Sequence, residues 1–249
     1  MVDDATSLYR DLPSPLLIGH RGLNTVAPEN TLEAIAAAAD LGVDGVEIDV
    51  RPTRDDAIVV FHDRDLARMA NRPHRIEALD LRELGSVDLG RGARIPILDD
   101  VLDLCRQRGL FVNVELKRDV PSRRRLVRAV ARCLKRHERR LPLVVSSFDP
   151  AMLADFRRRA PQVPLGVLYA SRHRWVRRLA GPLRAAALHP DHRLVRAADL
   201  RAAHAAGRRV MCWTVNSEPA TRRLLDMGID GVMTDDPERL LPIFGRGAA

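Results

Sequence analysis

Short apolar runs alternate along this chain with longer segments in which apolar residues recur at helical spacing. This alternation is typical of repeated β-α units built around a parallel sheet. The apolar runs predict strands at Leu16–His20, Gly45–Val50, Phe111–Lys117, Leu143–Phe148, Leu165–Tyr169, Ala185–His189, Val210–Val215 and Gly231–Thr234. The helical segments are expected to begin near Asn30, Asp99, Ser122, Pro150, Ser171, Ala197, Glu218 and Pro237.

Eight such units in 249 residues favour an α/β fold of the closed (β/α)8 TIM-barrel type, with an open doubly wound sheet as the competing architecture. One further apolar run, Ala57–Phe61, interrupts the alternation and is followed by the polar stretch Asp63–Arg94. We expect this part to form a short insertion after the second strand. Because no linker or change of composition divides the chain, residues 1–249 are expected to form a single domain.

The composition is 46% hydrophobic and 30% charged, which predicts a soluble globular protein and excludes a disordered or fibrous one. The net charge is +8, and residues 120–209 carry 22 basic against 5 acidic side chains. Such an excess raises nucleic acid, anionic membranes and phosphate-bearing substrates as partners. Nearly all the basic residues are arginine, a bias that codon composition also produces, so the charge alone does not select among these partners.

The cysteines and the N-terminus bear on the cellular compartment. Cys105, Cys133 and Cys212 lie far apart within apolar patterns, which predicts buried thiols rather than a disulfide framework or a zinc site. The first residues lack the apolar core of a signal peptide, and no stretch reaches the ~18 apolar residues of a membrane span. We therefore expect a cytoplasmic protein.

Polar residues at the carboxyl ends of the predicted strands carry the candidate chemistry, because barrel enzymes place their catalytic groups there. Glu47 and Asp49 lie two residues apart on one face of a strand, and Glu115 occupies the same kind of position on the next. Converging carboxylates repel one another unless a cation neutralises them, which indicates a divalent metal. Oxygen ligands favour Mg²⁺ or Ca²⁺, although the nearby histidines leave a transition metal open.

The first strand ends in His20-Arg21-Gly22, the run Ala57–Phe61 leads into His62, and Lys117 follows Glu115. Two histidines can serve as acid and base, and the two cations can bind phosphate oxygens. Together with a metal, these groups are what the hydrolysis of a phosphodiester requires.

The motifs together resemble those of the glycerophosphodiester phosphodiesterases. The match runs from about residue 16 to about residue 240 and consists of the following pieces, in order: His20-Arg21-Gly22, Ala27-Pro28-Glu29-Asn30-Thr31, Glu47-Ile48-Asp49-Val50 with Thr53, Val59-Val60-Phe61-His62-Asp63, Glu115-Leu116-Lys117, Ser146-Ser147-Phe148-Asp149, Trp213-Thr214-Val215-Asn216 and Gly231-Val232-Met233-Thr234-Asp235. Each piece alone is weak, but eight in the same order are specific.

The resemblance implies a (β/α)8 barrel that hydrolyses a glycerophosphodiester to glycerol 3-phosphate and an alcohol. It implies that Glu47, Asp49 and Glu115 hold the metal. His20 and His62 would be the general base and acid, in an order that the sequence leaves open. Arg21 and Lys117 would contact phosphate oxygens, and Trp213 would line the substrate pocket. Asn30 is expected to cap the first helix of the barrel.

The sequence predicts less specific roles for several other residues. His189, at the end of the sixth predicted strand, is a further candidate for substrate contact, whereas His74, His137, His173, His192 and His204 are expected to be solvated. The segment Arg172–Arg178 places Trp175 among arginines, which suits peripheral contact with an anionic membrane.

Three functions follow as hypotheses. The first is an enzyme acting on small deacylated diesters such as glycerophosphocholine or glycerophosphoethanolamine. The second is an enzyme of the lysophospholipase D or sphingomyelinase D kind acting on membrane lipids. The third, a noncatalytic nucleic-acid binder, is disfavoured because the basic segment lacks interleaved aromatic residues, so we expect no nucleic-acid partner.

Overall fold

The computed structural model describes residues 5–137, 141–171 and 178–245, and it contains a closed barrel of eight parallel strands. Neighbours in the barrel follow the chain, and pairing of the first strand with both the second and the last closes the cylinder. This closure excludes the open doubly wound sheet. The barrel strands are β1 (Leu16–His20), β2 (Gly45–Pro52), β4 (Phe111–Leu116), β5 (Leu143–Ser147), β6 (Leu165–Tyr169), β7 (Ala187–Pro190), β8 (Arg209–Cys212) and β9 (Gly231–Thr234).

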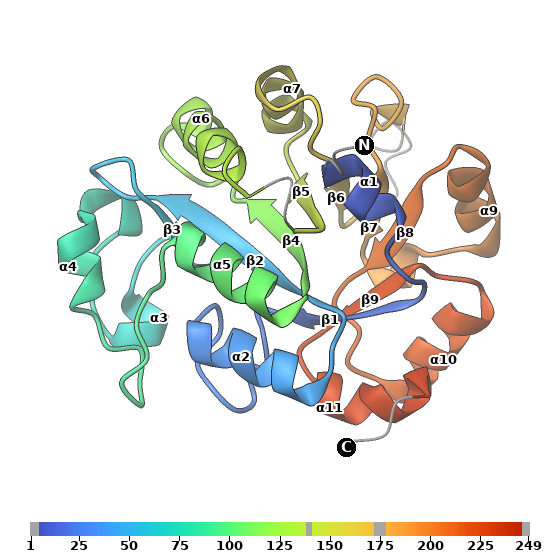
Figure 1. Cartoon of the computed structure of the whole chain (residues 1–249), viewed down its shortest axis with the longest axis horizontal. Coiled ribbons are helices and arrows are strands. Elements are labelled where there is room, and N and C mark those ends of the chain that lie inside the picture. Colours follow the sequence, from blue (N-terminus) through green and yellow to red (C-terminus); the bar gives the residue numbers. More distant parts are fainter. Residues whose placement is uncertain (1–4, 138–140, 172–177, 246–249) are drawn as a thin grey trace.

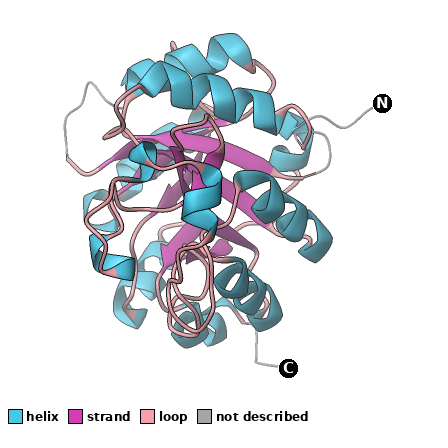
Figure 2. Cartoon of the chain, turned by 90° about the vertical axis from the view of Figure 1, so that its left-hand side faces the viewer, coloured by secondary structure: helices cyan, strands magenta, loops and turns pink. Residues whose placement is uncertain are grey.

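Helices surround the strands on all sides (Figure 1; Figure 2). The helices of the β-α units are α2 (Leu32–Leu41), α5 (Leu98–Arg108), α6 (Arg123–Leu134), α7 (Pro150–Arg159), α9 (Ala197–Ala205), α10 (Glu218–Asp226) and α11 (Pro237–Leu240). The 3-10 turns η2 (His192–Leu194) and η3 (Leu241–Phe244) complete this outer layer. Among the described residues, no helix combines the length and the apolar character that crossing a membrane requires.

The predicted insertion after the second barrel strand is present and has an apolar core of its own. It starts with β3 (Ile58–Val60), which pairs antiparallel with β2, and continues through α3 (Ala67–Ala70), η1 (Ile76–Ala78) and α4 (Leu81–Gly85). These elements lie beside the barrel at the left of Figure 1. Its core is formed by Val59, Phe61, Leu66, Ile76, Leu84, Val87, Leu89 and Ile95. His62 directly follows Phe61 of this core, so the packed insertion holds the backbone of His62 in place.

Side chains that alternate along the strands divide the main core into two parts. The larger part lies between the sheet and the helices. The smaller part fills the inside of the barrel and consists of Tyr9, Leu16, Ile18, Phe111, Val144, Ala187, Met211 and Met233. Tyr9 belongs to the N-terminal helix α1 (Ala5–Arg10), and its ring lies 6.0 Å from that of Phe111. The barrel interior is therefore closed by side chains at the end where the strands begin.

The expected elements agree with the structure apart from their ends. The strand expected at Ala185–His189 runs from Ala187 to Pro190, and the one expected at Val210–Val215 ends at Cys212. A helix start near Ser171 falls next to residues 172–177, which lie outside the described part, as does Trp175. The three cysteines are free and buried, as predicted.

The expectation that Asn30 caps the first barrel helix is wrong. Thr31 is the N-cap of α2, and its hydroxyl accepts a hydrogen bond from the backbone N–H of Ala34. The Asn30 side chain is instead buried against Asp49, in the site described below.

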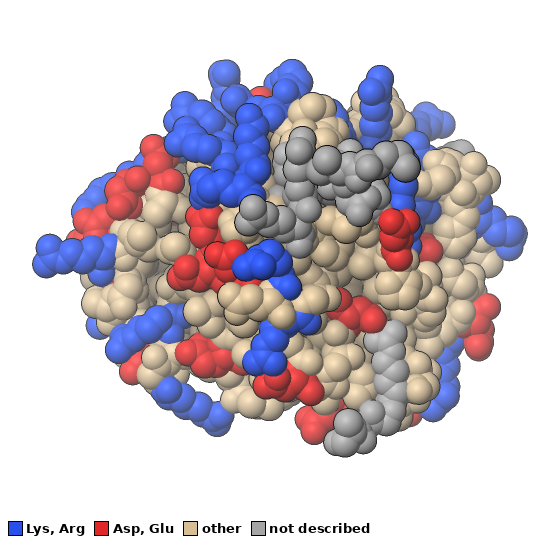
Figure 3. Space-filling model, in the orientation of Figure 1, with Lys and Arg blue, Asp and Glu red and all other residues tan. Residues whose placement is uncertain are grey.

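The basic charge of the middle segment lies on the outer layer. Helix α6 buries an apolar stripe against the barrel and leaves Arg124, Arg128 and Arg132 exposed at four-residue intervals. Lys and Arg side chains gather over this part of the surface (Figure 3). No ion pair involves these three arginines within the described residues. This stripe is consequently a solvated helix face on the barrel wall.

Candidate active site

Strand register brings the three predicted metal ligands together at the carboxyl end of the barrel. Asp49 on β2 lies beside Glu115 on β4, and Glu47 lies beside His20 on β1. Carboxylate oxygens of Glu47, Asp49 and Glu115 all lie within 4.8 Å of one another. The group is thus assembled by backbone pairing between adjacent strands rather than by a flexible loop.

Glu47 is the least compensated member of this group. Its side chain is buried, and neither carboxylate oxygen has a hydrogen-bond partner in the described part of the chain. The imidazole Nε2 of His20 is 3.7 Å from Glu47 Oε2. Burial, reinforced by the nearby charge of Asp49, raises the pKa of Glu47 well above its usual range. A buried carboxylate of this kind needs a proton or a cation.

Asp49 has the opposite environment. Lys117 Nζ is 3.2 Å from Asp49 Oδ1, Arg21 Nε is 3.2 Å from Oδ2, and Asn30 donates a hydrogen bond to Oδ2 at 3.0 Å. Burial favours the neutral acid, but Lys117 and Arg21 outweigh it and hold the pKa of Asp49 well below its usual range. Lys117 also contacts Glu115, with Nζ 3.2 Å from Oε1. The two cations therefore stabilise the ionised form of Asp49.

The imidazole of His20 is held by the carboxylate of Asp235, which directly follows β9. Its Nδ1 lies 2.6 Å from Asp235 Oδ1. Asp235 is fixed in turn by Asn24 at 3.2 Å and by Asn216 at 2.8 Å, both donating from Nδ2. Because a carboxylate only accepts, the contact places a proton on Nδ1 and turns Nε2 towards Glu47.

His62 has a matching support. Its Nδ1 lies 2.7 Å from Asp63 Oδ1, while Arg68 Nε donates to Asp63 Oδ2 at 2.6 Å. Arg68 also forms two hydrogen bonds with Glu29, at 2.6 and 2.9 Å, and Glu29 accepts another from Arg21 at 2.9 Å. A continuous chain of ion pairs thus links the first loop of the barrel to the insertion that carries His62.

The two imidazoles differ in electrostatic environment. Burial lowers the pKa of His20, but the hydrogen bond to Asp235 and the charge of Glu47 outweigh it, so the pKa is raised. Burial lowers the pKa of His62 as well. The charge of Asp49 opposes this effect, but burial together with Lys117 and Arg21 outweighs it, so this pKa is lowered. The two pKa values are therefore shifted in opposite directions, upwards for His20 and downwards for His62.

The backbone around Arg21 is shaped for this arrangement. Arg21 adopts a left-handed conformation with φ 63°, as does Asn30 with φ 61°. Their backbones are joined by a hydrogen bond from Asn30 N to Arg21 O of 3.0 Å. Gly22 has φ +86°, and a Cβ there would lie 2.7 Å from the backbone of Ala34, so only glycine lets the loop approach α2 this closely.

Two adjoining cavities meet at these residues. The smaller, of about 140 Å³, has the polar groups His20, Glu47 and Lys117 on one side and the apolar side chains Phe148, Leu168 and Trp213 on the other. The rings of Phe148 and Trp213 lie edge to face, 5.4 Å apart at 84°. Trp213 Nε1 donates to the carbonyl of His189 at 2.8 Å, which fixes the indole.

The larger cavity, of about 620 Å³, adjoins the first. The two share His62, Glu115, Lys117 and Phe148 as wall residues. Beyond these four, charged side chains from the insertion and from the loop after β4 line the larger one. A diester whose phosphate lies at the shared wall would extend into both spaces.

Comparison with known proteins decides the family. Residues 20–239 match the model of the glycerophosphoryl diester phosphodiesterase family. A glycerophosphodiester phosphodiesterase of Caldanaerobacter subterraneus is 30% identical over 239 residues, which cover 93% of this chain and 98% of that protein. The chain belongs to the glycerophosphoryl diester phosphodiesterase family. It is accordingly a phosphoric diester hydrolase, as the motifs predict.

Solved structures show the same architecture for this phosphodiesterase. An Oleispira antarctica phosphodiesterase in complex with the product sn-glycerol-3-phosphate has a TM-score of 0.87 and 29% identity, with 93% of this chain and 97% of that chain covered. A glycerophosphodiester phosphodiesterase from Thermotoga maritima has a TM-score of 0.78 and 27% identity, covering 93% and 99%. The predicted (β/α)8 barrel is thereby confirmed.

The structure brings all eight sequence-predicted site residues of this phosphodiesterase to one end of the barrel. His189, the further candidate for substrate contact, does not join these eight residues. It is fully buried, its ring lies against Gly166, and it is on neither cavity wall, so the expected substrate contact is wrong. The ring fits there because Gly166 has no side chain: a Cβ would lie 2.6 Å from His189 Cε1.

Several residues of the site were not assigned a role from the sequence. Asp235 and Arg51 each carry a readable signal, since they lie two residues beyond inward-facing positions on their strands, Met233 and Asp49. Phe148 lies in a family motif but was given no function. Arg68 offers no signal, because its contacts with Glu29 and Asp63 depend on how the insertion folds over the first loop.

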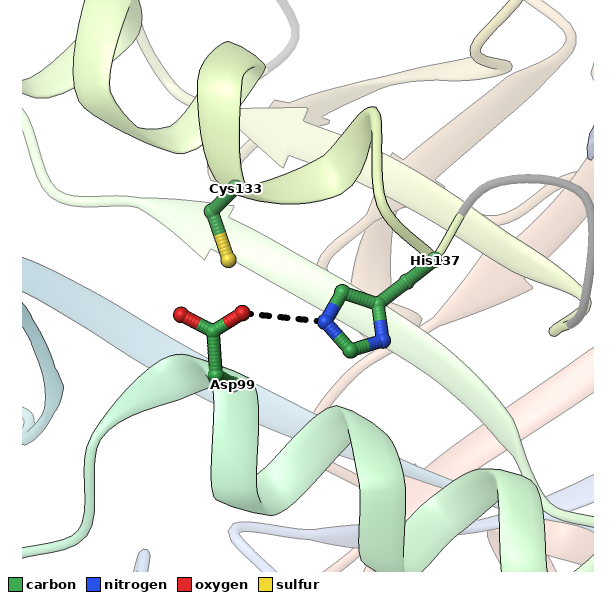
Figure 4. A group of neighbouring side chains, drawn as sticks. All are labelled: Asp99, Cys133 and His137. Carbon is green, nitrogen blue, oxygen red and sulfur yellow. Dashed lines mark hydrogen bonds and ion pairs between the residues drawn. The ribbon is translucent and has the colours of Figure 1, made fainter.

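A second group of potential ligands lies away from the site, on the outer wall of the barrel. It comprises Asp99 on α5, Cys133 on α6 and His137 just after α6 (Figure 4). His137 Nε2 is 3.0 Å from Asp99 Oδ1, and Arg136 bridges both Asp99 oxygens at 2.7 Å. His137 is buried, so the expectation that it is solvated is wrong. Since Arg136 already occupies the carboxylate, the group is an ion-pair clamp between two helices.

Proposed function

We propose that this protein hydrolyses glycerophosphodiesters to glycerol 3-phosphate and an alcohol, with Glu47, Asp49 and Glu115 as ligands of a divalent cation. The observation that carries the proposal is the buried carboxylate of Glu47, which has no hydrogen-bond partner among the described residues and lies beside two further carboxylates. Ligands that are all carboxylate oxygens suit the hard ions Mg²⁺ and Ca²⁺. Such an ion would supply charge stabilisation for the phosphoryl oxygens.

His20 and His62 act as the acid–base pair in this proposal. Asp235 and Asp63 hold the two Nδ1 atoms, which leaves both Nε2 atoms for proton transfer. One imidazole takes the proton from the attacking hydroxyl as the new P–O bond forms. The other gives a proton to the leaving alcohol oxygen as the old P–O bond breaks. The attacking oxygen belongs to water or to the neighbouring glycerol hydroxyl.

Arg21 and Lys117 position the phosphate in the same proposal. Both line the smaller cavity and carry positive charge beside Asp49. The apolar wall of Phe148 and Trp213 then faces the carbon side of the substrate. The product complex of the Oleispira antarctica relative supports glycerol 3-phosphate as the product.

Small deacylated diesters, such as glycerophosphocholine and glycerophosphoethanolamine, fit this site better than membrane lipids. Among the described residues, the smaller cavity has a volume of only about 140 Å³, and most of the side chains that line the larger one are charged. These features disfavour the lysophospholipase D and sphingomyelinase D alternative.

The decisive experiment measures glycerophosphocholine hydrolysis with and without EDTA, followed by separate addition of Mg²⁺ and Ca²⁺. We expect chelation to abolish turnover and one of the two ions to restore it. A matched control is Asp99→Asn, which alters the outer-wall clamp and should leave metal dependence unchanged. Full activity after exhaustive chelation would refute the metal mechanism.

A further inference from the structure

The larger cavity has two arginines that nothing in the proposed reaction uses. Arg118 directly follows Lys117, and Arg64 follows His62 and Asp63, so both lie next to the proposed machinery. Both side chains are exposed on the cavity wall. Within the described residues neither guanidinium forms an ion pair with a carboxylate. Both cations therefore lie near Lys117, one of the two residues proposed to bind the phosphate, and are available to a ligand.

The carboxylates of the same wall are already engaged. Glu115 contacts Lys117, and Asp119 accepts two hydrogen bonds from Arg51 at 2.7 and 2.8 Å. Asp63 is bound by His62 and Arg68, as described above. Asp65 accepts a hydrogen bond from the backbone N–H of Ala67 at 3.1 Å. The wall therefore offers a ligand more free positive charge than free negative charge.

Arg118 is also held in place. Its guanidinium carbon lies 5.6 Å from the centroid of the Phe148 ring, within the range of a cation–π contact. Phe148 belongs to both cavities, and its other neighbour is Trp213. The aromatic pair thus orients a cation at the boundary between the phosphate site and the larger cavity. A guanidinium fixed in this way loses less freedom when it binds an anion.

Building on the proposed function, we propose that the larger cavity is the subsite for the leaving alcohol, and that Arg118 and Arg64 select alcohols that carry a further anionic group. The ligand class is a polar head group bearing a phosphate or a carboxylate. Guanidinium groups recognise both anions through paired N–H donors. A choline head group, whose quaternary ammonium is cationic, would meet two like charges there.

The test compares two substrates that differ only in one phosphate, glycerophosphoinositol and glycerophosphoinositol 4-phosphate, with glycerophosphocholine as the cationic reference. For the wild type we expect kcat/KM to be about fivefold higher for the phosphorylated substrate, the size of one exposed ion pair. Arg118→Gln should bring this ratio close to one, and Arg64→Gln should lower it in part. Raising the salt concentration should reduce the wild-type ratio.

Arg124→Gln is the matched control, since Arg124 is an exposed arginine of α6 outside both cavity walls, and it should keep the wild-type ratio. Equal kcat/KM for the two inositol substrates, a preference for glycerophosphocholine, or an unchanged ratio in Arg118→Gln would overturn the subsite while hydrolysis itself stands. If none of the three diesters is hydrolysed, the proposed function fails and the subsite falls with it.

Discussion

Arg51 Nε donates a hydrogen bond of 3.0 Å to the backbone carbonyl of His62. The same guanidinium, which is only 1% exposed, reaches Glu77 of the insertion at 2.9 Å and both oxygens of Asp119 after β4. One buried arginine thus ties a proposed catalytic histidine to two other segments. Because His62 enters from the insertion rather than from a barrel strand, we expect its position to depend on this contact.

Replacing Arg51 tests that dependence. We expect Arg51→Met to lower kcat by about tenfold or more with a smaller change in KM, because His62 moves while the phosphate cations stay. The uncompensated Glu77 should also reduce the free energy of unfolding by roughly 3 kcal/mol. Steady-state kinetics and chemical denaturation measure the two effects.

Arg54→Met is the control for Arg51, since Arg54 forms exposed ion pairs with Asp80 and Glu83 of the same insertion. It should change kcat little and stability by less than about 1 kcal/mol. If both variants lose kcat equally, the insertion as a whole, and not the Arg51 contact, determines the position of His62.

Asp235→Asn tests the carboxylate behind His20. The asparagine keeps the shape but no longer only accepts, so it no longer holds the proton on Nδ1. We expect kcat to fall by about 10²–10⁴, the range for loss of general acid–base catalysis, with the pH profile of kcat altered. Asp230→Asn is a matched control, because Asp230 lies 2.7 Å from His204 in a similar pair outside the cavities. A kcat within twofold of the wild type for Asp235→Asn would contradict the role given to this contact.

Glu47→Gln should separate stability from activity. The raised pKa of Glu47 means that the ionised carboxylate destabilises the metal-free fold at neutral pH. The neutral glutamine side chain should therefore raise the melting temperature of the metal-free protein by about 2–4 °C, which corresponds to roughly 1 kcal/mol. Turnover with added metal should fall more than about 100-fold. Thermal unfolding in EDTA and metal titration calorimetry check both parts. A lower melting temperature together with undiminished metal binding would show that Glu47 is a structural residue.

His189 should make stability depend on pH. It is fully buried, and burial lowers its pKa from 6.5 to about 3. Between these values the unfolded chain binds a proton that the folded protein does not. The free energy of unfolding should thus decrease as the pH falls below about 6.5, by up to about 1.4 kcal/mol per pH unit from this group.

Denaturation of His189→Gln at several pH values between 7 and 5 measures this contribution. The variant should show a weaker pH dependence, whatever its absolute stability. His74→Gln, at an exposed position of the insertion, should retain the wild-type slope. Identical slopes in all three proteins would assign the acid sensitivity to other groups.

The cluster of Glu47, Asp49 and Glu115 was predictable because its members follow from local rules. Glu47 and Asp49 alternate on one strand, and closure of the barrel in chain order places the next strand's Glu115 beside them. The N-cap of α2 was mispredicted because local rules allow two residues at this position. Asn30 and Thr31 are both favoured N-cap residues, and only the buried contact of Asn30 with Asp49 selects Thr31 for the cap.

By itself the sequence predicted the alternation of strands and helices, the insertion and the candidate reactive groups, because the periods of helices and strands and the order of motifs are local properties. That the sheet closes into a barrel was decided by the pairing of the first strand with the last. Tertiary structure alone decided how those groups are held. The Asp235–His20 contact spans 215 residues, and the Arg51–Asp119 pair spans 68. Such pairs form only when the closed barrel brings distant loops to one rim. Burial in a low-dielectric environment makes an unpaired charge unfavourable there, so the fold is most stable when each charged group has its partner.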